Sequence, residues 1–262
     1  LEMRKMLEVK HLTYEVMENG VKRRLVDDVS FAVQDGEMLV ITGPNGGGKS
    51  TIAKLLMGIE RADSGEILLD GRDLSPMNVD ERANAGIGYA FQQPPSFKGM
   101  TVERLLNLAA GERLPESVCC ELLSSVGMCA REYLKREADA TLSGGERKRI
   151  EIATVLAKSH KICIFDEPEA GIDLWSFSML VDQFERIHEK KKESLLLISH
   201  QERIIRMADR ILVVGDGRIQ DGGSREEMLP RLFPEESGCA CRNENGKRED
   251  GSCECEAGCG SR

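Results

Sequence analysis

The sequence predicts an α/β fold with a parallel-sheet core, an antiparallel β layer and an inserted helical subdomain. The core is indicated by three apolar runs, at residues 37–42, 162–165 and 195–199, which are separated by helical patterns and flanked by glycine-rich or polar turns. Short continuous apolar runs are typical of parallel strands that are buried on both faces. A chain of 262 residues can bury one substantial core of this class, and a second independent domain is not expected.

The antiparallel layer is indicated at the start of the chain. Residues 7–14 alternate between apolar and polar, and residues 25–33 form a second strand-like stretch. Asn19-Gly20 lies between them and is a hairpin signal, because both residue types tolerate a positive φ. We therefore expect two antiparallel strands before the first strand of the core.

The helical subdomain is expected at about residues 94–141, between Pro94-Pro95 and Leu142. This stretch contains no strand-like run, and its spacing predicts helices at 102–110, 116–126 and 130–138. The body of the protein is expected to be one domain, residues 1–233. Residues 234–262 have almost no large apolar side chains and cannot build a core, so we expect a flexible, cysteine-rich tail.

A glycine-rich loop follows the first core strand and precedes a helical stretch at 52–57. This strand–loop–helix order is that of a phosphate-binding loop. Glycines let backbone N–H groups turn toward a triphosphate, and the helix N-terminus adds positive potential. The lysine would reach the β- and γ-phosphates and the serine hydroxyl would ligate Mg²⁺. The loop, here called the phosphate loop, consists of Gly43, Pro44, Asn45, Gly46, Gly47, Gly48, Lys49, Ser50 and Thr51.

The run 162–165 ends in two carboxylates, Asp166 and Glu167. Such a pair can divide two tasks: Asp166 would hold the magnesium shell, and Glu167 would orient or deprotonate the water that attacks the γ-phosphate. An acidic turn after a core strand is the alternative, which the upstream Lys49 makes less attractive.

The overall composition restricts the class of protein. The net charge is −9 and the isoelectric point is about 5.2, so no broad cationic surface is expected for nucleic acid. No apolar stretch approaches the roughly 20 residues that span a bilayer, and no secretory signal opens the chain. We expect a cytoplasmic protein with no direct membrane insertion.

A third motif, Leu142-Ser143-Gly144-Gly145-Glu146, opens a helix whose N-terminal amides would bind anionic oxygen; we call residues 142–146 the signature. With it, the chain resembles an ATP-binding cassette (ABC) ATPase. The resemblance covers about residues 7–232 and rests on the phosphate loop, Gln92, the signature, the Asp166-Glu167 strand and His200, all in family order.

The resemblance implies a head-to-tail homodimer that forms on ATP. The signature of one subunit would close on the ATP held by the phosphate loop of the other. Ser143, Gly144 and Gly145 would contribute to that site, with Ser143 and Gly145 contacting the γ-phosphate. Asp173 would lie across the dimer seam.

The resemblance also implies roles for three further residues. Gln92 would reach Mg²⁺ and the attacking water, His200 would hold the γ-phosphate, and Tyr14 would be the platform for adenine. Each has a plainer alternative: Gln92 as a loop amide, His200 as a helix-capping surface residue, and Tyr14 as a half-buried strand aromatic, with Phe31 as a rival aromatic.

Two departures from the common ABC pattern are informative. Glu146 replaces the usual signature glutamine, and Glu169 occupies a position that is more often threonine. Three segments resemble SufC, the ATPase of the Suf iron–sulfur assembly system. They are Glu146 with its following basic run at 147–149, residues 133–136 and residues 200–205. This resemblance implies a SufB/SufD-like scaffold protein as partner.

Two other functions are compatible with the same ATP chemistry. One is the nucleotide-binding subunit of a membrane ABC transporter, whose partner spans the membrane. The other is an ABC protein of DNA repair, which the acidic composition and the lack of a long coiled-coil insertion disfavour.

The cysteines fall into two groups. Those of the body are most simply small buried apolar residues: Cys119, Cys120, Cys129 and Cys163. The tail cysteines are dense enough for Zn or an Fe–S cluster, although their spacing matches no standard pattern and a redox-sensitive tail with incidental cysteines is the alternative. They are Cys239, Cys241, Cys253, Cys255 and Cys259.

Overall fold

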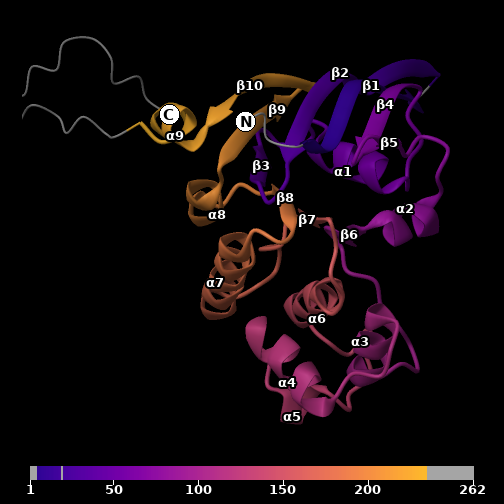
Figure 1. Cartoon of the computed structure of the whole chain (residues 1–262), viewed down its shortest axis with the longest axis vertical. Helices are drawn as coiled ribbons and strands as arrows, with labels where there is room; N and C mark the ends of the chain where they lie inside the picture. The colour runs from indigo at the N-terminus through magenta and orange to yellow at the C-terminus, as the bar shows by residue number, and fades with distance from the viewer. Residues whose placement is uncertain (1–4, 19, 235–262) are drawn as a thin grey trace, which may run out of the picture.

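The computed structural model describes residues 5–18 and 20–234. A six-stranded sheet forms its centre, in the order β10-β9-β3-β8-β7-β6 (Figure 1). Neighbouring strands are parallel except for β10, which pairs antiparallel with β9. The strands are β3 (Met38–Thr42), β6 (Ile87–Ala90), β7 (Ile162–Asp166), β8 (Ser194–Ile198), β9 (Arg210–Gly215) and β10 (Arg218–Ser224). The three apolar runs of the sequence are thus confirmed as β3, β7 and β8.

Both faces of the central strands are buried, because alternate residues of β3, β7 and β8 enter different cores. In β3, Met38 and Val40 pack into one cluster, and Leu39 and Ile41 pack into the other. β7 and β8 divide their side chains in the same way. A strand covered on both sides must be apolar throughout, which explains why these strands were visible in the sequence.

The second sheet is antiparallel and has the order β2-β1-β4-β5. Its strands are β1 (Lys5–Glu18), β2 (Val21–Gln34), β4 (Ser64–Leu69) and β5 (Arg72–Asp73). Gly20, with φ +79°, lies between β1 and β2; Asn19 of the expected turn is outside the described residues. The helix α1 (Lys49–Met57) shares one core with both sheets. The antiparallel layer is therefore confirmed.

The helical part lies at the opposite end of the molecule from this second sheet (Figure 1). It contains α3 (Val102–Ala110), α4 (Glu116–Ser125) and α5 (Ala130–Tyr133), which pack near α6 (Gly144–Leu156). The third helix was predicted too long. Residues 134–138 instead pair with the loop before α3 and with the start of that helix: Val102 N–H donates to Arg136 O over 2.9 Å, and Ala138 N–H donates to Met100 O over 2.8 Å.

The remaining helices complete the core and its surroundings. The core that contains Met38 and Val40 also takes side chains from α7, α8 and α9. Among the described residues, no helix is both long and apolar enough to cross a bilayer. The helices are α2 (Val79–Ala85), α7 (Leu174–Lys190), α8 (Glu202–Met207) and α9 (Arg225–Leu232).

The expectation for the body cysteines is right for two of the four. Cys119 and Cys163 are buried among apolar side chains, and burial raises the pKa of both thiols. Cys120 is half-buried, and Cys129, the N-cap residue of α5, is exposed. All five tail cysteines, from Cys239 to Cys259, lie outside the described residues.

Candidate active site

The phosphate loop joins β3 to α1 and depends on glycine at specific positions. Gly43 has φ +127°, and a Cβ there would lie 2.1 Å from Val214 O. Gly48 has φ +101°, and a Cβ would lie 2.5 Å from Leu25 O. Neither position accepts a side chain, so the loop can pass close to β9 and β2. Asn45 and Gly46 are exposed at its tip, while Gly47 is buried.

Lys49 is the first residue of α1 and is 4% exposed. Its ammonium donates to Gly43 O over 2.8 Å and to Pro44 O over 2.9 Å, so the side chain folds back over the loop. Burial lowers the pKa of Lys49, while Glu167 and Asp166 act in the opposite direction. These contacts place a cation against the backbone that would surround a phosphate.

Ser50 and Asp166 meet at the expected magnesium position. The Ser50 hydroxyl donates to Asp166 Oδ1 over 2.9 Å, and the fully buried Asp166 also accepts a longer bond from Tyr89 O–H at 3.4 Å. Burial raises the pKa of this carboxyl, and the Ser50 hydrogen bond opposes the rise. Mg²⁺ prefers oxygen ligands and takes only one or two carboxylates when phosphates supply the rest. The hydroxyl and carboxylate fit that chemistry, and no cluster of three or more His, Cys, Asp or Glu able to hold a metal occurs among the described residues.

Gln92 and Glu167 also come together. The amide Nε2 of Gln92 donates to Glu167 Oε2 over 2.8 Å, which links the loop after β6 to the residue after β7. Glu167 has φ +46°, and its N–H donates to Ile198 O over 3.0 Å. The second bond fixes a left-handed backbone that L-residues rarely adopt. The carboxylate therefore projects from a defined turn.

His200 directly follows the strand-end serine after β8 and is exposed. Its N–H donates to Glu169 Oε1 over 3.3 Å. Burial and the nearby charge of Lys49 lower the pKa of the imidazole, which favours its neutral form. His200 lines the same pocket as Gly43, Pro44 and Asn45, so it belongs to the same site as the phosphate loop.

The signature forms the start of α6. Ser143 Oγ accepts from Glu146 N–H over 3.2 Å, and Glu146 Oε2 accepts from Ser143 N–H over 2.6 Å, which completes a capping box. The Tyr133 hydroxyl also donates to Glu146 Oε1, and this bond is the main cause that lowers the pKa of Glu146 to about 2. The unusual glutamate is thus explained by capping. Ser143 and Gly144 are exposed.

The signature packs closely on the turn that precedes Asp173. A Cβ on Gly145 would lie 2.3 Å from Gly171 O, so only glycine allows this approach. Asp173 is exposed and caps α7 by accepting from Trp175 N–H over 3.1 Å and Ser176 N–H over 3.0 Å. The two segments predicted to lie at a dimer seam are therefore neighbours within the subunit.

Lys148 is part of the site that sequence reasoning missed. It is fully buried, and its ammonium donates to Phe91 O and, over 2.9 Å, to Asp166 O. It lies 3.7 Å from Glu151 Oε2. The side chain thereby joins the ends of β6 and β7. A lysine within a basic run gives no sequence signal of burial.

Tyr14 lies on β1 and is half-buried. Its hydroxyl donates to Glu60 Oε2 over 2.7 Å, and this bond is the main cause that raises the pKa of the phenol. The rival aromatic, Phe31, is only 9% exposed and packs in the core between the sheets. The adenine platform at Tyr14 stays a prediction.

The comparisons with known proteins agree with this geometry. The ABC transporter family matches residues 26–170. The chain is 36% identical over 217 residues to the uncharacterized ABC transporter ATP-binding protein MJ0035 of Methanocaldococcus jannaschii, covering 79% of this chain and 85% of that protein. It is 34% identical over 215 residues to the sulfate/thiosulfate import ATP-binding protein CysA of Burkholderia mallei, covering 78% of this chain and only 59% of that protein.

Solved structures show the same fold. The dimeric post-hydrolysis ATP-binding cassette MJ0796 bound to ADP and Pi has a TM-score of 0.77 at 21% identity, covering 84% of this chain and 99% of that one. An Atm1-family ABC exporter with ATP bound has a TM-score of 0.75 at 24% identity, covering 86% of this chain and 40% of that one. Sequence relatives and site geometry together show that this chain belongs to the ABC transporter family and is an ATP-binding cassette ATPase.

Proposed function

We propose that the chain is the ATP-hydrolysing subunit of a transporter-type ABC assembly, in which two copies close on ATP and move a membrane-spanning partner. The observation that carries the ATP-hydrolysing part of the proposal is the convergence of Lys49, the Ser50–Asp166 pair and the Gln92–Glu167 pair at the carboxyl ends of β3, β6 and β7. A crevice at the carboxyl ends of parallel strands is where open α/β sheets bind ligands.

Each residue has a task in this proposal. Lys49 neutralises the β- and γ-phosphates, and Ser50 and Asp166 hold Mg²⁺, which supplies charge neutralisation to the transferred phosphoryl group. Glu167 orients or deprotonates the attacking water. Gln92 holds that carboxylate and reaches Mg²⁺ and the attacking water. His200 donates to the γ-phosphate, and Tyr14 supports the adenine.

A second copy of the chain completes the site. Ser143 and Gly144 are exposed at the N-terminus of α6, where free amides favour an anion. Among the described residues, Ser143 bonds within the first turn of α6, through the capping box and through Arg147 N–H, which donates to its carbonyl over 3.0 Å. A Cβ on Gly144 would meet no atom within 4 Å, so this surface is open to ATP on another subunit. The dimeric cassette structures of MJ0796 support such an ATP-dependent homodimer.

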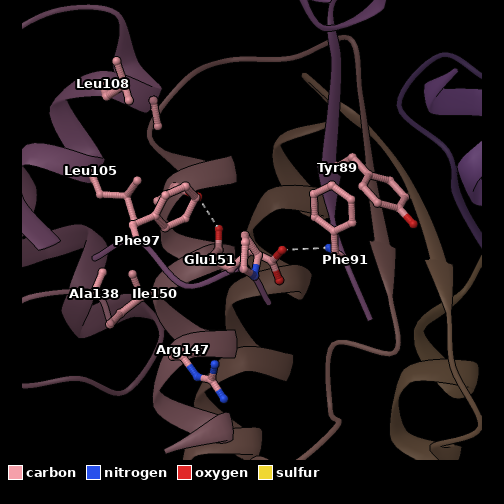
Figure 2. Close-up of a pocket in the computed structure, with 12 residues that line it drawn as sticks. Tyr89, Phe91, Phe97, Leu105, Leu108, Ala138, Arg147, Ile150 and Glu151 are labelled. Atoms are coloured by element: carbon pink, nitrogen blue, oxygen red, sulfur yellow. Dashed lines mark hydrogen bonds between the residues drawn. The ribbon is translucent and has the colours of Figure 1, made fainter. Parts of the chain in front are cut away.

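An apolar groove beside the site is suited to the partner. It lies between the loop after β6 and the helical part, and Figure 2 shows Phe91, Phe97, Leu105, Leu108, Ala138 and Ile150 around it. Leu108 is 65% exposed, whereas Glu151 lies at the groove and accepts from Phe91 N–H over 2.9 Å. A partner segment in this groove would contact the residue next to Gln92.

The names of the relatives favour one of the two kinds of partner that we consider. Both the archaeal protein and the CysA proteins carry transporter names, which favours a membrane partner over a SufB/SufD-like scaffold. The scaffold is the second candidate. It is favoured by the Tyr133–Glu146 hydrogen bond, which unites two of the segments that resemble SufC.

The domain division and the location of the protein are also proposals. The ATPase domain would comprise residues 1–233, with residues 94–141 as its helical subdomain, and would reside in the cytoplasm. A Zn or Fe–S site on the tail cysteines belongs with the scaffold candidate, since such an assembly handles iron and sulfur.

Purification of the full chain with its native partner tests the proposal. A stoichiometric complex with a multi-span membrane protein, extracted in detergent, is the expected result. A stoichiometric soluble complex with a scaffold protein would replace the transporter with the second candidate. Loss of ATP hydrolysis is not the readout here, since both candidates share it.

A further inference from the structure

The carboxylate of Glu169 joins two loops of the active site. Ser199 Oγ donates to Glu169 Oε1 over 2.7 Å, and His200 N–H donates to the same oxygen over 3.3 Å. Glu169 follows β7, and the other two residues follow β8. Oε1 of Glu169 therefore accepts two hydrogen bonds, one from the Ser199 side chain and one from the His200 main chain.

Both ends of this contact are fixed. Ser199 is fully buried, its N–H donates to Ile41 O over 3.2 Å, and its Oγ accepts from Gln201 N–H over 3.0 Å. On the other side, Glu169 O accepts from Ile172 N–H over 3.1 Å in the turn before Asp173. The carboxylate thus connects the turn before Asp173 to the backbone of His200.

The His200 ring depends on this backbone for its direction. Within the described part of the chain, no hydrogen bond holds the imidazole itself. The side chain is exposed, so packing constrains it little. A contact that fixes the main chain at residues 199–200 therefore determines where the ring can reach.

The second oxygen of Glu169 is unfavourable for the stability of the fold. Oε2 is buried and has no hydrogen-bond partner among the described residues. Burial raises the pKa of this carboxyl, and the hydrogen bond from Ser199 opposes the rise. A buried, half-satisfied carboxyl is unfavourable for stability, which points to a role other than stability.

We propose that Glu169 is a positioning residue that fixes the backbone of His200 and so aims the imidazole at the γ-phosphate. The inference rests on the role of His200 in the proposed function. It does not depend on which partner the ATPase moves. Glu169 acts through His200 and makes no contact with ATP of its own.

The test compares ATP hydrolysis by the full chain with Glu169→Ala, Glu169→Gln and the control Glu193→Ala. Glu193 is a matched control because its Oε1 accepts the N–H of another histidine, His160, over 3.1 Å at the opposite end of β8. We expect Glu169→Ala to lower kcat by about tenfold, with KM for ATP within about twofold of wild type. Glu169→Gln keeps an acceptor oxygen and should recover at least about half of wild-type kcat. Glu193→Ala should retain wild-type kcat.

A double-mutant cycle separates positioning from a general structural effect. If Glu169 acts through His200, adding Glu169→Ala to His200→Ala should lower kcat no further. Multiplying effects would overturn the proposal, as would an unrescued Glu169→Gln or a wild-type kcat for Glu169→Ala. Should the alanine variant fail to fold, Glu169→Asp, which withdraws the carboxylate by one methylene, takes its place in the same cycle.

The outcomes also distinguish this inference from the proposed function. A normal kcat for His200→Ala would overturn the role of His200 and, with it, the positioning role. An impaired His200→Ala beside a normal Glu169→Ala would overturn the positioning role alone. Neither result bears on the partner, which the co-purification identifies.

Discussion

Gln92 Nε2 donates a hydrogen bond to Glu167 Oε2 over 2.8 Å. The two residues meet because β6 and β7 are adjacent and parallel, with Ala90 opposite Phe165, so the positions that follow them lie side by side. Lys148 reinforces the arrangement by donating to the carbonyls of Phe91 and Asp166. The carboxylate of Glu167, which we propose activates the water, and the loop next to the groove are therefore one hydrogen-bonded unit.

Glu167→Gln should keep ATP binding and abolish turnover. The amide retains the shape of the carboxylate and leaves Ser50 and Asp166 to hold Mg²⁺, but it cannot accept the proton of the attacking water. We expect kcat to fall by about 100-fold or more. ATP should then trap a closed homodimer, measured by size-exclusion chromatography. Hydrolysis near the wild-type rate would show that another group activates the water.

Lys49→Ala should fail at an earlier step. In the proposed function its ammonium is the cation that the phosphate loop presents to the β- and γ-phosphates. Its removal also leaves the loop carbonyls of Gly43 and Pro44 without their donor. We expect ATP affinity to fall by about tenfold or more, measured by calorimetry. Unchanged ATP affinity together with lost turnover would show that Lys49 acts in hydrolysis and not in ATP binding.

Much of the fold was readable from the sequence because burial on both faces makes β3, β7 and β8 apolar throughout. The third helix of the helical part was mispredicted for a non-local reason. Residues 134–138 have helical spacing, yet their backbone bonds to residues 97–103, which local periodicity does not show.

The site was readable where chemistry demands a residue at a fixed position. Glycines at positions with a positive φ and carboxylates at strand ends can therefore be recognised in the sequence. Lys148 cannot, because a buried lysine and a solvated one look alike in a basic run. Only the packed structure shows that its charge is placed between two carbonyl oxygens. Glu146 and Glu169 were noticed as departures, but their hydrogen bonds were not predictable.

Leu108→Glu should impair partner docking and spare the ATPase fold. Leu108 is 65% exposed at the groove, so a charged side chain there opposes an apolar partner without disturbing the core. Met17→Glu is the matched control, since Met17 is 66% exposed on β1, away from the groove. We expect co-purification with the partner to be lost for the first variant and kept for the second. Equal recovery with both would place the interface elsewhere.

Glu151→Gln should change how stability depends on pH. Burial raises the pKa of Glu151 from 4.5 to about 7, and the charge of Lys148 opposes the rise. The unfolded carboxyl ionises at lower pH than the folded one, so the contribution of Glu151 to stability is fully present below pH 4.5 and is lost as the pH rises through about 7.

The glutamine variant keeps an acceptor for Phe91 N–H and does not titrate. Relative to this variant, the wild type should therefore lose between about 1 and 3 kcal/mol of unfolding free energy from acidic to neutral pH, measured by urea denaturation. Parallel pH profiles for the two proteins would mean that Lys148 keeps the carboxylate ionised throughout.

Deleting residues 235–262 tests the metal site predicted for the tail. Under anaerobic conditions the full chain should bind Zn, Fe or a cluster through some four of its five tail thiolates, and the truncated chain should not. Ultraviolet absorption and elemental analysis should both report the bound metal, and its binding should release protons.

ATP hydrolysis should be unchanged, because the residues assigned to the nucleotide all lie at or before His200. Cys129→Ser, which removes an exposed thiol of the body, is the control and should retain the metal. Equal metal content in the full and truncated chains would place the metal elsewhere and remove this support for an iron–sulfur scaffold partner.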